Sequence, residues 1–328
     1  DSFPRKMVLE ICLLVYFLFF LGYLIAGSLL VFAIFRTLHG GPFGASTVVN
    51  STMAIDVSYP SRRKEAIGYY GLSNNIATAL APTIGIFLYN YCNNFEVLFW
   101  VAFIFAGVGL FVGYTIKLFE KQTVNNRSKL SLDRFFLLRA WTIGVNIAFF
   151  GFCFGVISNY LAIYGQEMLG ITSGTGVYFM LLSGGLILSR FQGAKSLKEG
   201  KLTQNAAVGI IVSTVGFSIF VGLPNLVGYY LSALLIGLGN GHMWPAFQNM
   251  IIGIAHHNER GTANSTLLTS WDLGVGVGIL LGGVIGEYFG YKWAFISVVI
   301  VHLIGLIMYF AKTQKSYLDR KSTMQDEL

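Results

Sequence analysis

The sequence predicts an all-α membrane protein with about ten transmembrane helices, and three observations lead to this prediction. First, 55% of the 328 residues are hydrophobic and only 11% are charged, whereas soluble domains carry about 25% charged residues. Second, the chain contains ten apolar runs long enough to cross a bilayer core of ~30 Å. Third, nearly all Lys and Arg residues fall in alternate connections between these runs, as expected of a multi-pass protein.

The ten apolar runs are joined by short, turn-like connections, for example at 90–94 and 223–225, with one exception. The exception is a polar stretch at 118–134, which leaves four runs before it and six after it. The predicted helices are 7–27, 29–58, 66–91, 95–117, 136–164, 174–192, 204–223, 226–253, 262–288 and 292–312. We therefore expect an N-terminal helical bundle at 1–117, a linker at 118–134, a six-helix bundle at 135–314 and a tail at 315–328.

The basic residues predict the orientation of the chain. Of the 22 Lys and Arg residues, 19 lie on one side of the proposed membrane, and only Lys292 lies in a loop on the other side. Arg36 and Arg190 fall inside helices. Positive charge accumulates on the cytoplasmic side of membrane proteins. Both ends of the chain and the 118–134 linker are therefore expected in the cytoplasm, in a cell (inner or plasma) membrane.

Several other functions lack support in the sequence. The net charge of +7 comes from basic residues that lie in the connections on one side of the proposed membrane. Their positions are explained by the membrane orientation, so we expect no nucleic-acid partner. Cys12, Cys92 and Cys153 are scattered, which argues against a disulfide framework or a zinc site. There is no P-loop for ATP-driven transport. The glycines at 274–278 lie in mid-helix, so we interpret them as packing positions, and we expect no enzymatic activity, cofactor or metal.

The two halves of the chain show an internal repeat at an offset of 197 residues. The Arg-x-x-Ala pattern at 63–66 recurs at 260–263, at the start of matching helices. The matching glycine pairs are Gly40 and Gly237, Gly44 and Gly241, and Gly85 and Gly282. Two halves related about the membrane normal are typical of transporters. Because six helices follow the linker and four precede it, we expect two further helices, about 50–70 residues, ahead of Asp1.

The first six residues, DSFPRK, resemble part of a cytoplasmic loop motif of the Major Facilitator Superfamily, G-x-x-x-D-R-x-G-R-R/K. The mirrored loop at 193–201 matches its glycine and basic positions but has Leu197 where the motif has an acid. In that family the loop acid and Arg pair with an acid at the cytoplasmic end of the fourth helix. The resemblance implies a cytoplasmic gate formed by Asp1, Arg5 and Asp56. The alternative is that the Asp56 side chain only caps its helix and faces water.

Two helices resemble motifs of the family's proton-coupled exporters. Residues 36–44, RTLHGGPFG, are similar to R-x-x-Q-G-x-G-x-G, with His39 in place of Gln. Residues 77–86, ATALAPTIGI, are similar to G-x-x-x-G-P-x-x-G-G. An intramembrane Arg36 is costly unless it faces the bundle interior or reaches the membrane surface, and His39 either titrates or packs through a hydrogen bond. The implied helix-packing residues are Gly40, Gly44, Ala81, Pro82 and Gly85.

Polar residues of the second half predict a path for substrate or protons. Asp272 lies about ten residues inside an apolar run, ~15 Å from its start, and is the acid placed deepest in the membrane. We expect it to share a polar helix face with Asn264 and Ser265. An intramembrane acid is a functional candidate; the alternative is a structural Asp bonded to neighbouring helices. The candidate pathway residues are Arg36, His39, Asn240, His242, Gln248, Trp271 and Asp272.

The resemblance implies a Major Facilitator-type fold, with two six-helix bundles around a central cavity and about ten of an expected twelve helices present. It implies a secondary active transporter, and the exporter motifs favour proton-coupled efflux of a small molecule by alternating access. The alternatives are an uptake symporter for a sugar or metabolite and a non-transporting receptor on the same fold. The expected partners are a small-molecule substrate, protons and the lipid bilayer, and we expect a monomer.

Overall fold

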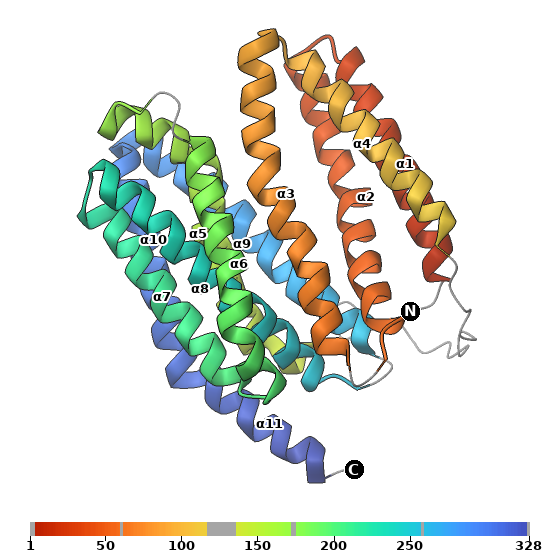
Figure 1. Ribbon diagram of the computed structural model, residues 1–328, viewed down its shortest axis with the longest axis vertical. Helices are drawn as coiled ribbons and strands as arrows, with labels where there is room; N and C mark the ends of the chain where they lie inside the picture. Colours follow the sequence, from red (N-terminus) through yellow and green to blue (C-terminus); the bar gives the residue numbers. More distant parts are fainter. Residues whose placement is uncertain (1–3, 60–61, 117–135, 172–174, 257–258, 327–328) are drawn as a thin grey trace. The chain divides into compact units, whose positions relative to one another are not determined.

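The computed structural model is all-helical and describes residues 4–59, 62–116, 136–171, 175–256 and 259–326 (Figure 1). No β-strand occurs among these residues. Short 3-10 and π segments at Leu138–Ala140 and Tyr309–Thr313 precede α5 and follow α10. The helices are α1 (Arg5–Ile25), α2 (Leu29–Asp56), α3 (Arg63–Cys92), α4 (Phe95–Thr115), α5 (Trp141–Leu169), α6 (Thr175–Lys198), α7 (Leu202–Gly222), α8 (Leu226–Gly253), α9 (Arg260–Phe289), α10 (Tyr291–Met308) and α11 (Gln314–Asp326).

Each of the ten predicted helices corresponds to one helix from α1 to α10, so the all-helical prediction is confirmed. Within the described ranges, six helical segments are long and apolar enough to cross a membrane. They include α1, α4, α5, α7, α9 and α10, the last continuing into α11. The others, α2, α3, α6 and α8, are long enough but richer in polar residues and glycine.

Local residues set many of the helix ends. The side chains of Ser28, Asn94 and Asn225 accept hydrogen bonds from backbone N–H groups in the first turns of α2, α4 and α8. Such caps satisfy N–H groups that have no partner within the helix. Asn93 and Gly170 end α3 and α5 with positive φ angles of 48° and 64°, a conformation that Gly and Asn adopt most readily. These are the residues of the turn-like connections in the sequence.

The N-terminal end of α5 differs from the prediction, which placed a helix at 136–164. The backbone N–H of Leu137 donates a 2.7 Å hydrogen bond to Oγ1 of Thr266, a residue on α9. A 3-10 turn follows, and α5 then runs from Trp141 to the left-handed Gly170. The apolar residues before Trp141 suggested a helix, but a hydrogen bond to a distant part of the chain holds them outside it.

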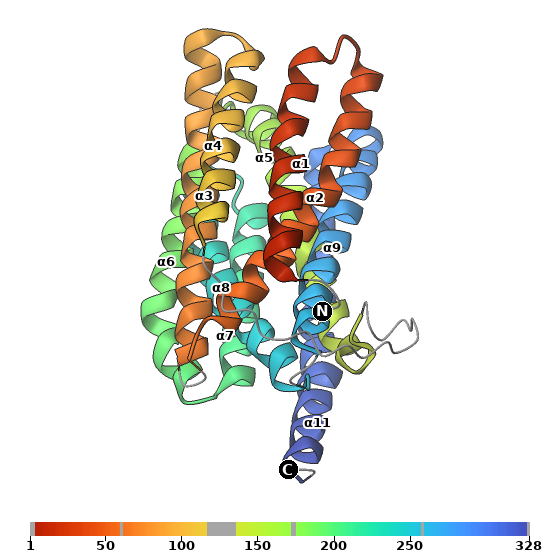
Figure 2. The ribbon, with the colours of Figure 1, turned by 90° about the vertical axis from the view of Figure 1, so that its right-hand side faces the viewer.

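The C-terminal part of the chain, which the sequence predicts as a tail at 315–328, is helical as far as Asp326. After α10 a π-helical segment leads directly into α11, which continues to Asp326 (Figure 2). Tyr309, Thr313 and Tyr317 from this stretch are buried. The hydroxyl of Tyr309 donates to the backbone oxygen of Thr203 at 2.7 Å. These buried side chains hold the helix against the protein beyond the end of the apolar run.

Helix contacts divide the chain into two compact units. Unit 1 contains 1–66 and 84–130, and unit 2 contains 67–83 and 131–328, so that α3 contributes to both. In unit 1, α1 packs against α2 and α4; in unit 2, α8 packs between α6 and α7, and α5 packs against α9 and α10 (Figure 1). The predicted linker at 118–134 lies outside the described residues.

Glycines allow close contacts between the helices of unit 2. A Cβ atom on Gly151 would lie 2.5 Å from the backbone oxygen of Trp271, and one on Gly274 or Gly278 would overlap the α5 backbone at Ala148 or Phe152. Small residues commonly form the contacts between membrane helices. The interpretation of the 274–278 glycines as packing positions is therefore confirmed for Gly274 and Gly278, whereas Gly276 faces open space.

Candidate functional site

The predicted contact between Arg5 and Asp56 is present in unit 1. The Nη1 atom of Arg5 pairs with Oδ2 of Asp56, joining the start of α1 to the end of α2. The two side chains are 33% and 35% exposed, so the pair lies at the surface of the unit. Asp1, the third member of the expected gate, lies outside the described residues. The role of this pair in gating stays a prediction.

His39 lies in the contact between α1 and α2. It is 3% exposed, and its Nδ1 lies 2.6 Å from the hydroxyl of Tyr23. The rings of Tyr16, Phe19 and Phe20 surround it, with centroids 4.3, 5.4 and 5.0 Å from the imidazole. These contacts favour the packing interpretation of His39 over a position on an open path.

Arg36, Gly40 and Gly44 are not part of the packed face of α2 in unit 1. The Arg36 side chain is exposed, and no described atom lies within 4 Å of a Cβ built on either glycine. The reason is that α2 presents another face, the one with His39, to α1. Within unit 1 the Arg36 side chain therefore does not face packed helices, and its place on a substrate or proton path stays a prediction.

The other predicted packing positions lie on α3. A Cβ on Gly85 would lie 3.4 Å from Cδ2 of Leu98 on α4, an ordinary van der Waals contact. Ala81 is exposed, and the Pro82 side chain lies outside the described part of the chain. The matching glycines of the second half, Gly237 and Gly241, pack closely against α6, so the repeat is clearer in sequence than in the contacts that each half makes.

Asp272 lies on a face of α9 that is turned away from α5. It is exposed, about 18 Å along the helix from its start, and forms no ion pair or hydrogen bond with any residue the structure describes. At 100° per residue it lies about 160° around the helix from the buried Ser270 and Gly274. Ser265, Thr269, Asp272 and Gly276 share this side of the helix with the apolar Leu268, Val275 and Ile279; the four polar or small residues are here called the polar face of α9.

Asn264 does not belong to the polar face of α9, which corrects the expected stripe. It is 1% exposed, and its Oδ1 accepts a 3.5 Å hydrogen bond from Nε2 of the buried Gln248 on α8. Asn240 is also bonded inside unit 2, because its Oδ1 accepts a 3.2 Å hydrogen bond from Oγ of Ser213. Gln248 and Asn240 thus connect helices of unit 2, and their place on a substrate or proton path stays a prediction.

An aromatic cluster lies beside the polar face of α9. The ring of Trp271 lies 5.1 Å from that of Trp244 on α8 and 5.4 Å from that of Phe154 on α5. All three side chains are partly exposed. Because Trp271 directly precedes Asp272, a partly open aromatic surface lies next to a carboxylate that has no partner among the residues described.

His242 lies inside the packing of α6, α7 and α8. It is 6% exposed, its Nδ1 lies 2.9 Å from Oδ1 of Asn205, and its Nε2 lies 3.5 Å from Oε1 of Gln192. Asn205 also donates to the backbone oxygen of His242 at 2.9 Å. Both ring nitrogens therefore have polar partners, and His242 is a hydrogen-bonded residue of the bundle.

Arg190 was not among the predicted site residues, although it lies in the same unit on α6. Its Nε is buried without a hydrogen-bond partner, and it makes no ion pair within the described ranges. Its Nη2 lies 2.9 Å from where a Cβ on Gly71 would be. The signal in the sequence was the isolated Arg in the run 174–192, since unpaired intramembrane charges are costly and commonly functional.

The fold and these residues define the class of protein: a multi-pass helical membrane protein whose long helices carry an acid and an arginine without ion-pair partners among the described residues. The chain belongs to the Major Facilitator Superfamily, whose sequence profile matches residues 1–241 and 206–326. This is a family of membrane transporters, not of enzymes. The small-molecule transport that characterises this family agrees with the transporter class that the resemblance implied.

Individual relatives support the same assignment. The staphylopine export protein of Staphylococcus aureus (strain Mu50 / ATCC 700699) is 23% identical over 274 residues, which cover 79% of this chain and 68% of the relative. Among solved structures, the human organic anion transporter MFSD10 (TETRAN) matches with a TM-score of 0.74 at 17% identity, covering 93% of this chain and 77% of its own. The transporter FucP in its outward conformation matches with a TM-score of 0.68 at 12% identity, over 93% and 82%.

Proposed function

We propose that this protein exports a small molecule across the membrane by alternating access and that inward proton movement drives the export. The observation that carries this proposal is the carboxylate of Asp272 on the polar face of α9, which has no ion-pair or hydrogen-bond partner within the described ranges. The exporter-like motifs at 36–44 and 77–86 and the similarity to an export protein favour export over uptake.

Asp272 has the properties that a coupling acid needs. A charged side chain deep in a membrane costs about 2.5–3.5 kcal/mol even on lenient insertion scales, and binding a proton removes that charge. A group whose protonated and charged forms favour different surroundings shifts the balance between two conformations. Asp272 would bind a proton from one side of the membrane and release it to the other side. Proton entry would therefore be linked to the opening of the substrate-binding site.

Two further features of unit 2 fit the binding of an organic cargo. The Trp271, Trp244 and Phe154 cluster offers partly exposed rings that pack well against apolar groups. The guanidinium of Arg190 has no acid partner among the described residues, and guanidinium groups bind carboxylates and phosphates through paired hydrogen bonds. We therefore propose a cargo that carries an acidic group, and staphylopine is the first compound to test.

The experiment compares cells that produce the wild-type protein with cells that produce Asp272→Asn or Thr269→Ser at equal membrane levels. Thr269→Ser is the matched control, since it keeps the hydroxyl on the same helix face. Untargeted mass spectrometry of medium and cell extracts, with staphylopine also supplied inside the cells, measures which compounds change their outside-to-inside ratio.

We expect the wild-type and Thr269→Ser proteins to raise this ratio for at least one compound, and Asp272→Asn to lose most of the effect. A protonophore that collapses the proton gradient should also remove it. Accumulation inside the cells would instead indicate an uptake symporter. No change for any compound would indicate a receptor, and full activity of Asp272→Asn would exclude Asp272 as the coupling acid.

A further inference from the structure

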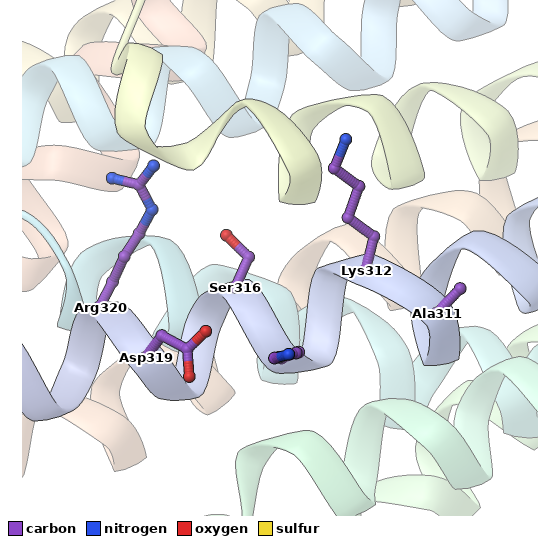
Figure 3. A pocket seen from close by; sticks show the side chains of 6 residues that line it. Ala311, Lys312, Ser316, Asp319 and Arg320 are labelled. Carbon is purple, nitrogen blue, oxygen red and sulfur yellow. The ribbon is translucent and has the colours of Figure 1, made fainter.

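A surface hollow lies along α11, directly after the apolar run of α10 (Figure 3). Its volume is about 390 Å³. Figure 3 shows Lys312, Ser316 and Arg320 pointing the same way, as their spacing of four residues predicts. The lining residues are Ala311, Lys312, Lys315, Ser316, Asp319 and Arg320.

The charge of this hollow is positive. Lys312, Lys315 and Arg320 provide three cations against the single carboxylate of Asp319 among the lining residues. Neither Lys315 nor Arg320 forms an ion pair with any residue in the described ranges. The Ser316 hydroxyl lies between Lys312 and Arg320 and adds a hydrogen-bond donor (Figure 3).

The hollow follows the predicted apolar run at 292–312, so we expect it near the boundary of the membrane core. Lys312 is the first charged residue after the α10 run, and its Nζ lies 4.4 Å above the ring of Trp141 at the start of α5. Tryptophan concentrates at the boundary between the apolar core and the headgroups. Phe310 and Leu138, 49% and 53% exposed, are apolar side chains near the same helix ends. A ligand in the hollow therefore has cations beside it and exposed apolar side chains close by.

We propose that this hollow binds the phosphate-bearing headgroup of an anionic phospholipid. Arg320 contacts the phosphate and the neighbouring Ser316 donates a hydrogen bond to it, while Lys315 lines the hollow from about 140° further around the helix and adds positive charge. The acyl chains lie along the apolar residues before Lys312. Arginine and lysine are the usual partners of phosphate, and basic pockets at the ends of membrane helices take anionic headgroups. The exposed apolar residues suit a lipid better than free phosphate, which has no apolar part to bury.

Binding at this place would stabilise the C-terminal helix. The same stretch of helix packs into unit 2 through the buried Thr313 and Tyr317, which lie about 20° and 60° around the helix from Arg320. A headgroup held by Arg320 and Lys315 would keep α11 beside the start of α5 and so protect these internal contacts. The lipid should therefore raise the temperature at which the whole protein unfolds.

The test measures thermal unfolding of the full chain in a neutral detergent while short-chain phosphatidylglycerol is added. Parallel samples receive short-chain phosphatidylcholine or inorganic phosphate. The binding variant is Lys315→Gln/Arg320→Gln. The matched control is Lys292→Gln/Lys321→Gln, which also loses two positive charges, one of them on the same helix, but keeps every residue that lines the hollow.

We expect phosphatidylglycerol to raise the Tm of the wild type and of the control by about 2 °C or more, with saturation, and to leave the Lys315→Gln/Arg320→Gln protein unchanged. Phosphatidylcholine and inorganic phosphate should have no effect on any of them. Equal shifts in both double variants, or a wild-type shift as large with phosphatidylcholine, would overturn the proposal. A shift with inorganic phosphate alone would show that the hollow binds the free anion rather than a lipid.

Discussion

At the scale of single residues, His39 and Asp272 show how similar sequence signals lead to different structural roles. Both are titratable groups inside long apolar helices. His39 is enclosed by the aromatic side chains of α1 and bonded to Tyr23, whereas Asp272 is exposed and unpaired among the residues described. We therefore assign His39 to helix packing and keep Asp272 as the candidate for proton coupling.

This assignment predicts how variants of the His39–Tyr23 pair behave. His39→Phe and Tyr23→Phe each leave one buried polar group without its partner, which costs about 1–3 kcal/mol. The double variant removes both groups and keeps two rings, so it should be less destabilised than the two single variants together. Thermal unfolding of the purified proteins measures the loss of stability in the two single variants and in the double variant.

Transport separates the packing role of His39 from a proton-carrying role. We expect His39→Phe to keep most of the efflux of whichever compound the wild type exports, after correction for protein level. Loss of efflux in His39→Phe, with full efflux in Tyr23→Phe at equal stability, would show that His39 carries protons.

At the scale of helices, the contact between α5 and α9 depends on glycine at particular turns. A Cβ on Gly274 would overlap the Ala148 backbone, while one on Gly276, half a turn away, would meet nothing within 4 Å. Gly274→Ala should therefore destabilise the protein by about 1–3 kcal/mol, as overpacked positions do. Gly276→Ala should be neutral or slightly stabilising, because Ala favours helix over Gly by up to ~1 kcal/mol.

Thermal unfolding of these two variants tests the helix contact directly, since both make the same chemical change on one helix. A lower Tm for Gly274→Ala than for Gly276→Ala is the expected order. The reverse order, or equal values, would mean that α5 and α9 do not approach each other at Gly274.

At the scale of the whole molecule, the distribution of basic residues predicts which side of the membrane each connection faces. The chain contains its own control, because the exposed Cys92 lies at the end of α3 on the side opposite the expected cytoplasmic linker. In intact cells, an impermeant thiol reagent should label Cys92. It should not label a cysteine placed at Asn125 in a chain whose other cysteines are replaced by Ser.

Strong labelling of Asn125→Cys from outside, with Cys92 protected, would invert the predicted orientation. Opening the cells before labelling is the control for both positions, since each cysteine should then react.

Composition and short-range pattern were sufficient to determine the class of this protein. Apolar runs of bilayer length, capping residues such as Asn94 and Asn225, and the left-handed Gly170 depend only on neighbours in the chain, so the sequence located helices α1 to α10 and most of their ends. Tertiary contacts decided the rest. The start of α5 depends on a hydrogen bond to Thr266, which is 129 residues away. The roles of His39, Asn264 and Asp272 depend on which face of each helix packs against another, and periodicity alone does not identify the neighbour that covers a face.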